Sequence, residues 1–150
     1  MSAPRETLTD RQPAGPAFPP GGQRRRLALA GQRKPVARAR EFTEGALADW
    51  QWPGAEDVVL LAAELVANAM LHAGGPIDLL LDITEARLRI EVGDSSPELP
   101  VLREPHRPGV PGGHGLYIVQ QASDRWGATP RADGKAVWAE IDAVSGPQPA

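Results

Sequence analysis

Apolar residues recur at intervals of three and four along two stretches in the first half of the chain. In residues 35–50 the apolar positions are Val36, Ala39, Phe42, Ala46, Leu47 and Trp50. This spacing predicts a helix, and Pro35 suits its first position. Residues 55–72 are richer still in apolar side chains and run into Ala73-Gly74-Gly75-Pro76. They predict a second, longer helix that stops at this glycine and proline cluster.

The next segments show the alternation that is typical of strands. Residues 87–92 set Leu88, Ile90 and Val92 against charged neighbours, and residues 77–83 form a second apolar run. Because only three residues separate the two runs, we expect an antiparallel hairpin. Shorter patterns predict strands at 27–30, 125–127 and 137–141 and a helix at 115–123. Helices followed by strands, without strict βαβ alternation, predict an α+β fold with the helices on one face of a mostly antiparallel sheet.

Glycine and proline mark the segments that lack regular structure. Eight of them lie in residues 1–22, ten in residues 93–115 and three in the last five residues. The terminal clusters predict disordered tails at 1–22 and 144–150, around one domain at 23–143. The internal cluster predicts a long loop, and a loop of this length is usually a lid, a binding loop or plain disorder.

Charge is divided unevenly along a chain whose net charge is −3. Residues 1–40 carry nine basic and two acidic side chains, whereas residues 41–150 carry seven and seventeen. An acidic body repels the phosphate backbone, so DNA binding is not expected. The absence of cysteine excludes disulfides, cysteine zinc sites and thiol catalysis. Since no apolar run suits a membrane span or a signal peptide, we expect a cytoplasmic protein without a membrane partner.

Three polar side chains form one stripe on the second predicted helix. After Asp57, the only polar residues up to position 72 are Glu64, Asn68 and His72, each four residues after the last. A solvent-facing stripe is the plain interpretation, but such a stripe normally carries lysine or arginine, and residues 55–72 contain neither. A carboxylate one turn from a carboxamide suits base chemistry or the binding of a hard cation.

Two further motifs follow in the chain. Asp94 ends a predicted strand and precedes Ser-Ser-Pro, which alone is typical of a turn. Pro111-Gly-Gly-His-Gly115 leads into a predicted helix, where backbone N–H groups favour an anion such as phosphate. A flexible helix start explains these glycines equally well. Neither the Walker A motif nor GxGxxG after a strand is present.

Taken in order, these motifs resemble those of the ATPase superfamily that includes gyrase and the histidine kinases. The stand-alone anti-sigma-factor serine/threonine kinases and their actinobacterial relatives are the most similar group. They also share motifs like Asp124-Arg-Trp-Gly127 and Gly134-Lys-x-Val-Trp-x-Glu140, so that the resemblance spans residues 24–142. It implies the Bergerat-type ATP-binding fold, a two-layer α/β sandwich, with ATP and Mg²⁺ as ligands.

The resemblance also implies a role for each residue of the first two motifs. Glu64 matches the catalytic carboxylate that activates the nucleophile, and Asn68 matches the Mg²⁺ ligand, with His72 in the same motif. Asp94 matches the acid that accepts a hydrogen bond from the adenine amino group. The residues that follow it in the actinobacterial form, and that count with it as ATP-binding, are Ser96 and Pro97.

The third motif corresponds to the lid and its phosphate-contacting end. The lid is expected at about 98–111, with Gly113, His114 and Gly115 as its phosphate-contacting end. Gly112 and Leu116 count with them as ATP-binding. Two departures from the family pattern are expected to weaken ATP binding. His114 stands where many relatives have arginine, and Ala136 stands where relatives have a threonine that supports the adenine network. Trp126 and Trp138 are expected in the core and are assigned no chemistry.

The function implied is that of an Mg-ATP-binding regulator, an anti-sigma-factor-like serine/threonine kinase that phosphorylates an antagonist protein. The alternative is a non-catalytic, nucleotide-gated module that binds a sigma factor, and a DNA-binding protein with a basic arm is a distant third. A histidine kinase is disfavoured, because no helix offers a dimerisation hairpin with a phospho-accepting histidine. The sequence leaves open the identity of the protein partner, the role of the basic tail and whether the chain forms a homodimer.

Overall fold

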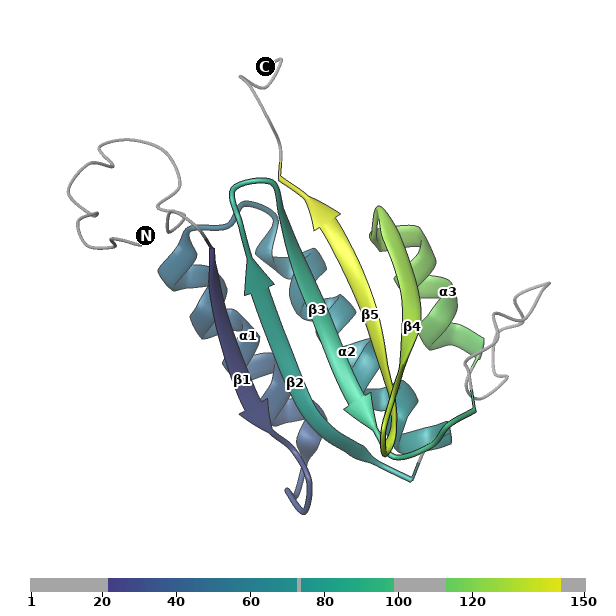
Figure 1. Cartoon of the computed structure of the whole chain (residues 1–150). Coiled ribbons are helices and arrows are strands. Elements are labelled where there is room, and N and C mark those ends of the chain that lie inside the picture. Colours follow the sequence, from purple (N-terminus) through teal and green to yellow (C-terminus); the bar gives the residue numbers. More distant parts are fainter. Residues whose placement is uncertain (1–21, 73, 99–112, 144–150) are drawn as a thin grey trace.

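Five antiparallel strands form one sheet in the order β1-β2-β3-β5-β4 (Figure 1). The structure is a computed structural model and describes residues 22–72, 74–98 and 113–143. The strands are β1 (Gln23–Ala28), β2 (Pro76–Ile83), β3 (Arg87–Asp94), β4 (Arg125–Arg131) and β5 (Gly134–Asp142). The predicted hairpin is confirmed, since β2 and β3 pair antiparallel across the short turn between them.

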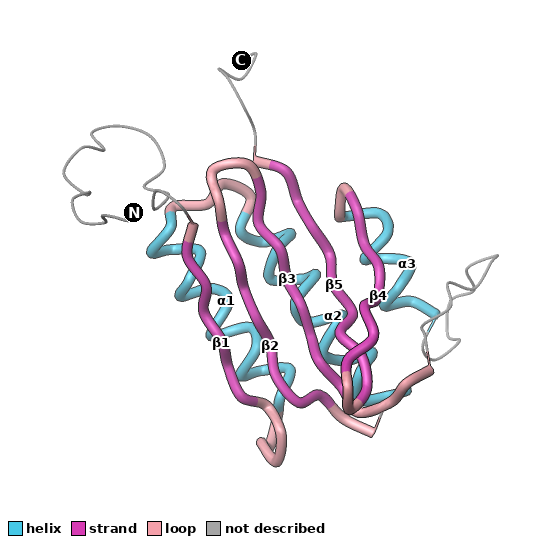
Figure 2. Tube along the Cα trace, in the orientation of Figure 1, coloured by secondary structure: helices cyan, strands magenta, loops and turns pink. Residues whose placement is uncertain are grey.

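Three helices cover one face of this sheet. They are α1 (Pro35–Trp50), α2 (Ala55–His72) and α3 (Gly113–Ala122). Figure 2 shows all three on the same side of the five strands, and α2 packs against both of the other helices. The α+β class and the two-layer arrangement predicted from the sequence are therefore confirmed.

The core lies between the helices and the inner face of the two central strands. Alternate residues of β2 and β3 point into it and are fully buried, namely Leu79, Leu81, Ile83, Leu88, Ile90 and Val92. The facing side chains of α2 include Leu61, Leu65 and Val66. Burying each such side chain contributes roughly 1.5–3 kcal/mol, so this layer holds the central helix firmly on the sheet.

The first strand differs from its prediction because it contains the arginine run. Arg24 and Arg26 point to the outer face and pair with β2 carboxylates, each at 3.0 Å. Arg25 points toward α1, where its guanidinium donates to Asp49 over 2.9 Å and stacks 4.9 Å from the ring centroid of Trp50. Each arginine thus has an acceptor, which lets a charged segment serve as an edge strand.

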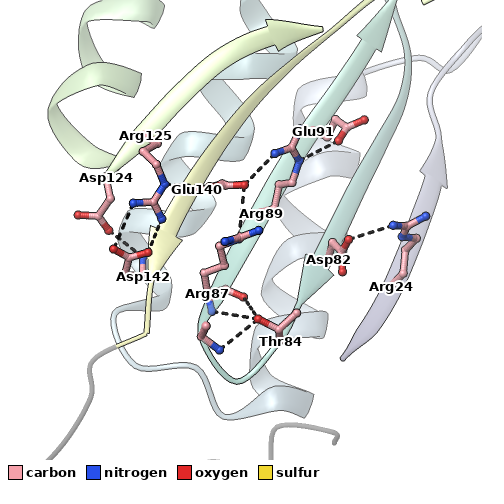
Figure 3. A network of polar contacts seen from close by, with 11 residues as sticks. Arg24, Asp82, Thr84, Arg87, Arg89, Glu91, Asp124, Arg125, Glu140 and Asp142 are labelled. Atoms are coloured by element: carbon pink, nitrogen blue, oxygen red, sulfur yellow. Dashed lines mark hydrogen bonds and ion pairs between the residues drawn. The ribbon is translucent and has the colours of Figure 1, made fainter. Parts of the chain in front are cut away.

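The outer face of the sheet carries a network of ion pairs across β3, β4 and β5 (Figure 3). Arg89 donates to Glu140 over 2.7 Å, and Arg125 donates to Glu140 over 3.0 Å and also to Asp142. Burial raises the pKa of Glu140, but the hydrogen bonds from Arg125 and Arg89 outweigh it and lower that pKa. The hydrogen bond from Arg125 likewise lowers the pKa of Asp142.

Trp138 belongs to this outer face, so its predicted place in the core was wrong. The Arg89 guanidinium lies 4.3 Å from the Trp138 ring centroid, and the indole N–H donates to Thr129 Oγ1 over 3.2 Å. Strand alternation explains the difference, because inner-facing Val137 and Ala139 flank Trp138. Trp126, by contrast, packs against the core as expected.

Several predictions fall on parts of the chain beyond the described residues. The tail 144–150 and all but Gly22 of the tail 1–22 lie outside them, as does all but Glu98 of the predicted lid 98–111. These boundaries stay predictions. Within the described ranges, no helix is long and apolar enough to cross a membrane.

The lowered pKa of Glu140 predicts a stability contribution that depends on pH. A carboxyl whose folded pKa lies below its unfolded pKa stabilises the fold above the unfolded value, about 4.3 for glutamate, and loses this effect as pH falls through the folded value. We expect Glu140→Gln to lower the free energy of unfolding by about 1–2 kcal/mol at neutral pH, since its guanidinium partners are partly exposed. Thermal unfolding of both proteins between pH 7 and pH 3 should show the difference shrinking below about pH 4.

Glu85→Gln is the matched control, because Glu85 is exposed in the turn between β2 and β3. It should leave the melting temperature near that of the unaltered protein at every pH. A Glu140→Gln difference that stays constant down to pH 3 would contradict the assigned role of the network.

Candidate functional site

Two polar residues one turn apart on α2 differ in their burial. Glu64 is half-buried, whereas Asn68, one turn later, is only 8% exposed. Asn68 Oδ1 is buried and has no hydrogen-bond partner among the described residues. A buried carbonyl oxygen without a donor costs about 1–3 kcal/mol, so this oxygen is an acceptor poised for a ligand.

The solvent-facing interpretation of the polar stripe is therefore wrong for Asn68. The side of α2 that does face solvent includes large exposed apolar residues, with Leu60 37% and Leu71 62% exposed. By helical spacing both lie on the same side as Glu64. The stripe thus has Glu64 at the rim and Asn68 within the sandwich. The last residue of the stripe, His72, ends α2, and its side chain is outside the described part.

Asp94 is held at the end of β3 by two donors. Its side chain is 2% exposed, and its Oδ1 accepts hydrogen bonds from the Ser96 N–H at 2.9 Å and from the Lys135 ammonium at 3.0 Å. The same ammonium donates to the Ser96 carbonyl over 3.2 Å. Asp94 thus forms the turn that the sequence predicted, an Asx turn that a buried lysine closes. The same residue is the one predicted to bind a ligand.

The start of β5 lies directly against the backbone of this turn. Gly134 has φ of +152°, and a Cβ on it would clash with the Asp94 carbonyl oxygen and lie 2.7 Å from Ser95 Cα. Only glycine fits such a close approach without a shift of the backbone. The glycine therefore brings Lys135, in register with Asp94, into contact with the carboxylate.

The remaining predicted residues are only partly within the described chain. Ser96 is half-buried, and its hydroxyl accepts a hydrogen bond from the Glu98 N–H at 3.2 Å, while Pro97 is exposed. Gly112 lies outside the described residues. The first turn of α3 begins at Gly113 and includes His114, Gly115 and Leu116, whose side chains are also outside them.

These elements meet at one end of the sandwich. Figure 1 shows the end of α2, the end of β3, the start of β5 and the start of α3 at the same, lower end of the view. In the sequence, Asn68 lies four residues before the end of α2, Asp94 is the last residue of β3, and Gly113 is the first residue of α3, whereas Glu64 lies one turn before Asn68. Such a set of groups suits a ligand that combines hydrogen-bond donors, a cation and an anion.

Lys135 contacts Asp94 and was missed by sequence reasoning, whereas Ala136, the expected departure from the family threonine, faces the other way. Ala136 pairs with Gly93 and therefore lies on the outer face, opposite to Asp94. A hydroxyl at position 136 would therefore not point toward Asp94, and the expected weakening of ATP binding stays a prediction. The alternation of Val137 and Ala139 was the available signal, because it places Lys135 on the inner face.

The sequence matches the model of the histidine kinase-like ATPase domain over residues 30–141, most of the chain. The protein belongs to this family. The match includes Glu64, Asn68, Asp94 and the glycine-rich segment before α3. No curated protein matches the chain. Membership supports ATP binding, and the antiparallel sheet with helices on one face is consistent with an ATPase domain of this kind.

The residues of this histidine kinase-like ATPase domain fit Mg²⁺ bound together with a nucleotide. Within the described ranges no cluster of three or more His, Cys, Asp or Glu side chains holds a metal by itself. Mg²⁺ commonly takes one or two protein oxygens, with phosphates and water as its other ligands. The unpartnered Asn68 Oδ1 is an oxygen donor of the required kind.

The close approach of Gly134 to the Asp94 turn predicts that an alanine at position 134, but not at position 45, destabilises the fold. Gly134→Ala should lower the free energy of unfolding by about 1–3 kcal/mol, because β5 must move away from the Asp94 turn. Gly45→Ala is the matched control, since Gly45 lies inside α1 and a Cβ added to it would meet open space. That change should stabilise the domain by about 0.5–1 kcal/mol. Chemical denaturation measures both, and an unaffected Gly134→Ala would contradict the tight approach.

Proposed function

We propose that this chain binds Mg-ATP at the shared end of α2, β3, β5 and α3 and acts as an anti-sigma-factor-like serine/threonine kinase on an antagonist protein in the cytoplasm. The observation that carries the proposal is the buried Asn68 Oδ1, which has no partner among the described residues and lies one turn from Glu64. In a histidine kinase-like ATPase domain, this pairing supplies a cation ligand beside a proton acceptor.

In this proposal each part of the site takes one part of the ligand. Asn68 Oδ1 is a ligand of Mg²⁺, and Asp94 accepts a hydrogen bond from the adenine amino group. Backbone N–H groups at the start of α3 suit the phosphates, because the positive end of the helix dipole lies there. Residues proposed to line the ATP site beside them are His72, Ser96, Pro97, Gly112, Gly113, His114, Gly115 and Leu116.

The chemistry that bound ATP supplies is a transferable γ-phosphoryl group. Glu64 accepts the proton of the attacking serine or threonine hydroxyl. Its half-buried position at the rim supports this role, because a protein substrate can approach it from solvent. The exposed Leu60 and Leu71 lie on the same side of α2, so the antagonist would contact apolar surface next to the base.

A nucleotide-gated module that binds a sigma factor without phosphorylating anything would use the same ATP site. The half-buried carboxylate of Glu64 favours the kinase, because gating alone needs no proton acceptor. The proposed partners are an antagonist protein, a sigma factor or both, and a second copy of the chain that pairs through the sheet.

Glu64→Gln separates the two functions. The glutamine keeps the size of the side chain and one carbonyl oxygen but removes the base, so ATP should still bind while phosphoryl transfer falls by roughly 10²–10⁴-fold. Phosphate incorporation into candidate antagonists, measured beside a pull-down of the sigma factor, gives both readouts. Glu56→Gln, an exposed change in the first turn of the same helix, should leave both at the level of the unaltered protein.

The opposite outcome is equally informative. If the unaltered protein binds ATP and its sigma factor but labels no antagonist, and Glu64→Gln behaves identically, the kinase is overturned and the gated module remains. If neither protein binds ATP in calorimetry, both functions fail together.

Asn68→Ala should remove the Mg²⁺-dependent part of ATP affinity and leave the fold intact. The change deletes an unpaired buried oxygen, so stability should not fall, while the cation loses its protein ligand. Calorimetric titration of ATP with and without Mg²⁺ measures the effect. Thr43→Ala is the matched control, because Thr43 Oγ1 is the other unpartnered buried side-chain oxygen of the described residues and lies on α1. Unchanged Mg²⁺ dependence in Asn68→Ala would remove this residue from the site.

A further inference from the structure

The buried ion pair between Lys135 and Asp94 is not explained by stability. The two side chains are 6% and 2% exposed, and their charged atoms lie 3.0 Å apart. Removing two charges from water offsets much of their attraction, and well-packed apolar residues often serve a fold as well or better. The burial of Lys135 therefore indicates a functional role at the candidate site.

The hydrogen bonds of Lys135 indicate what this role is. The ammonium and the Ser96 N–H both donate to Asp94 Oδ1, and the ammonium also donates to the Ser96 carbonyl. Lys135 thus joins the carboxylate and the turn after it into one closed ring of hydrogen bonds. A carboxylate has two oxygens, each with two acceptor positions. With Oδ1 engaged twice, the ring fixes the plane of the carboxylate, and Oδ2 is the oxygen that remains for a ligand donor.

We infer that Lys135 is a positioning residue for base recognition: it holds Asp94 so that Oδ2 accepts a hydrogen bond from the exocyclic amino group of a 6-aminopurine nucleotide. The inference rests on the proposed function, since it concerns the base end of the same ATP site. The inference adds Lys135 as a residue that acts through Asp94. Selectivity for the amino group of the base then depends on both Lys135 and Asp94, not on the carboxylate alone.

The backbone is built to keep the lysine in this place. Gly134 allows β5 to start against the Asp94 turn, and the β3–β5 register sets Lys135 opposite Asp94. The next residue, Ala136, faces the outer side of the sheet. A side chain that reaches Asp94 from β5 must therefore stand at position 135, and an ammonium on a four-carbon stem spans the gap to both acceptors.

The test compares two nucleotides that differ only in the amino group. Calorimetry with ATP and with purine riboside triphosphate, which lacks the amino group, should give the unaltered protein a preference for ATP of about 10- to 100-fold. In Lys135→Met this preference should fall to about twofold or less, while the affinity for purine riboside triphosphate stays within about twofold. Arg131→Met is the matched control, because Arg131 pairs with Asp78 and Glu91 on the outer face and should leave the preference intact.

The possible outcomes separate a failure of the inference about Lys135 from a failure of the proposed function. An equal loss of affinity for both nucleotides in Lys135→Met would mean that the lysine is only structural, and an unchanged preference would mean that it does not orient Asp94; either result overturns the inference and leaves ATP binding standing. No binding of either nucleotide by the unaltered protein would overturn the proposed function itself. If Lys135→Met lacks a cooperative thermal transition, Lys135→Gln replaces it, because the amide keeps a donor for Oδ1. Its preference should then lie between those expected for the unaltered protein and for the methionine variant.

Discussion

The packing of α2 onto β2 and β3 is the constraint on which the site depends. Leu61, Leu65 and Val66 are at most 1% exposed, and each contributes roughly 1.5–3 kcal/mol through burial. This packing fixes the rotation of the helix, so that the oxygen of Asn68 must enter the interior one turn after Glu64 reaches the rim. The apolar contacts therefore offset the 1–3 kcal/mol or so that an unpaired buried oxygen costs. The apolar contacts of α2 therefore keep Asn68 Oδ1 buried although the burial of this oxygen is itself unfavourable.

Alternation along the strands divides the sheet into two faces with different tasks. The inner face carries the core and, at its end, Asp94 and Lys135, whereas the outer face carries arginines and carboxylates that satisfy one another. Because side chains alternate with a period of two, neighbouring residues of a strand lie on opposite faces of the sheet. Lys135 and Ala136 illustrate this. Lys135 contacts the Asp94 carboxylate on the inner face, whereas its neighbour Ala136 lies on the outer face.

The sequence predicted those elements whose apolar pattern is dense. The bounds of α2 were predicted to the residue and the end of α1 approximately, and the β2–β3 hairpin was recognised, because burial alone decides such segments. The edge strands were harder. In β1 the arginines are stabilised by carboxylates distant in sequence, and in β4 the residues Thr129, Pro130 and Arg131 carry no apolar alternation. For the site, residues on one helix were predictable by spacing, but the contact of Lys135 with Asp94 was not. It depends on a register between strands that are about forty residues apart, which local patterns do not encode.

The base end and the cation end of the proposed site are held by different kinds of structure. Asp94 and Lys135 are fixed by strand register and a close backbone approach, whereas Asn68 is fixed by helix packing. Residues that share no partner and no element generally contribute independently to stability and binding. Changes at one end should therefore alter recognition of the base without altering the response to Mg²⁺, and the reverse. In the proposed site, a change at β5 would therefore alter nucleotide selectivity while α2 keeps the groups proposed for Mg²⁺ binding and phosphoryl transfer.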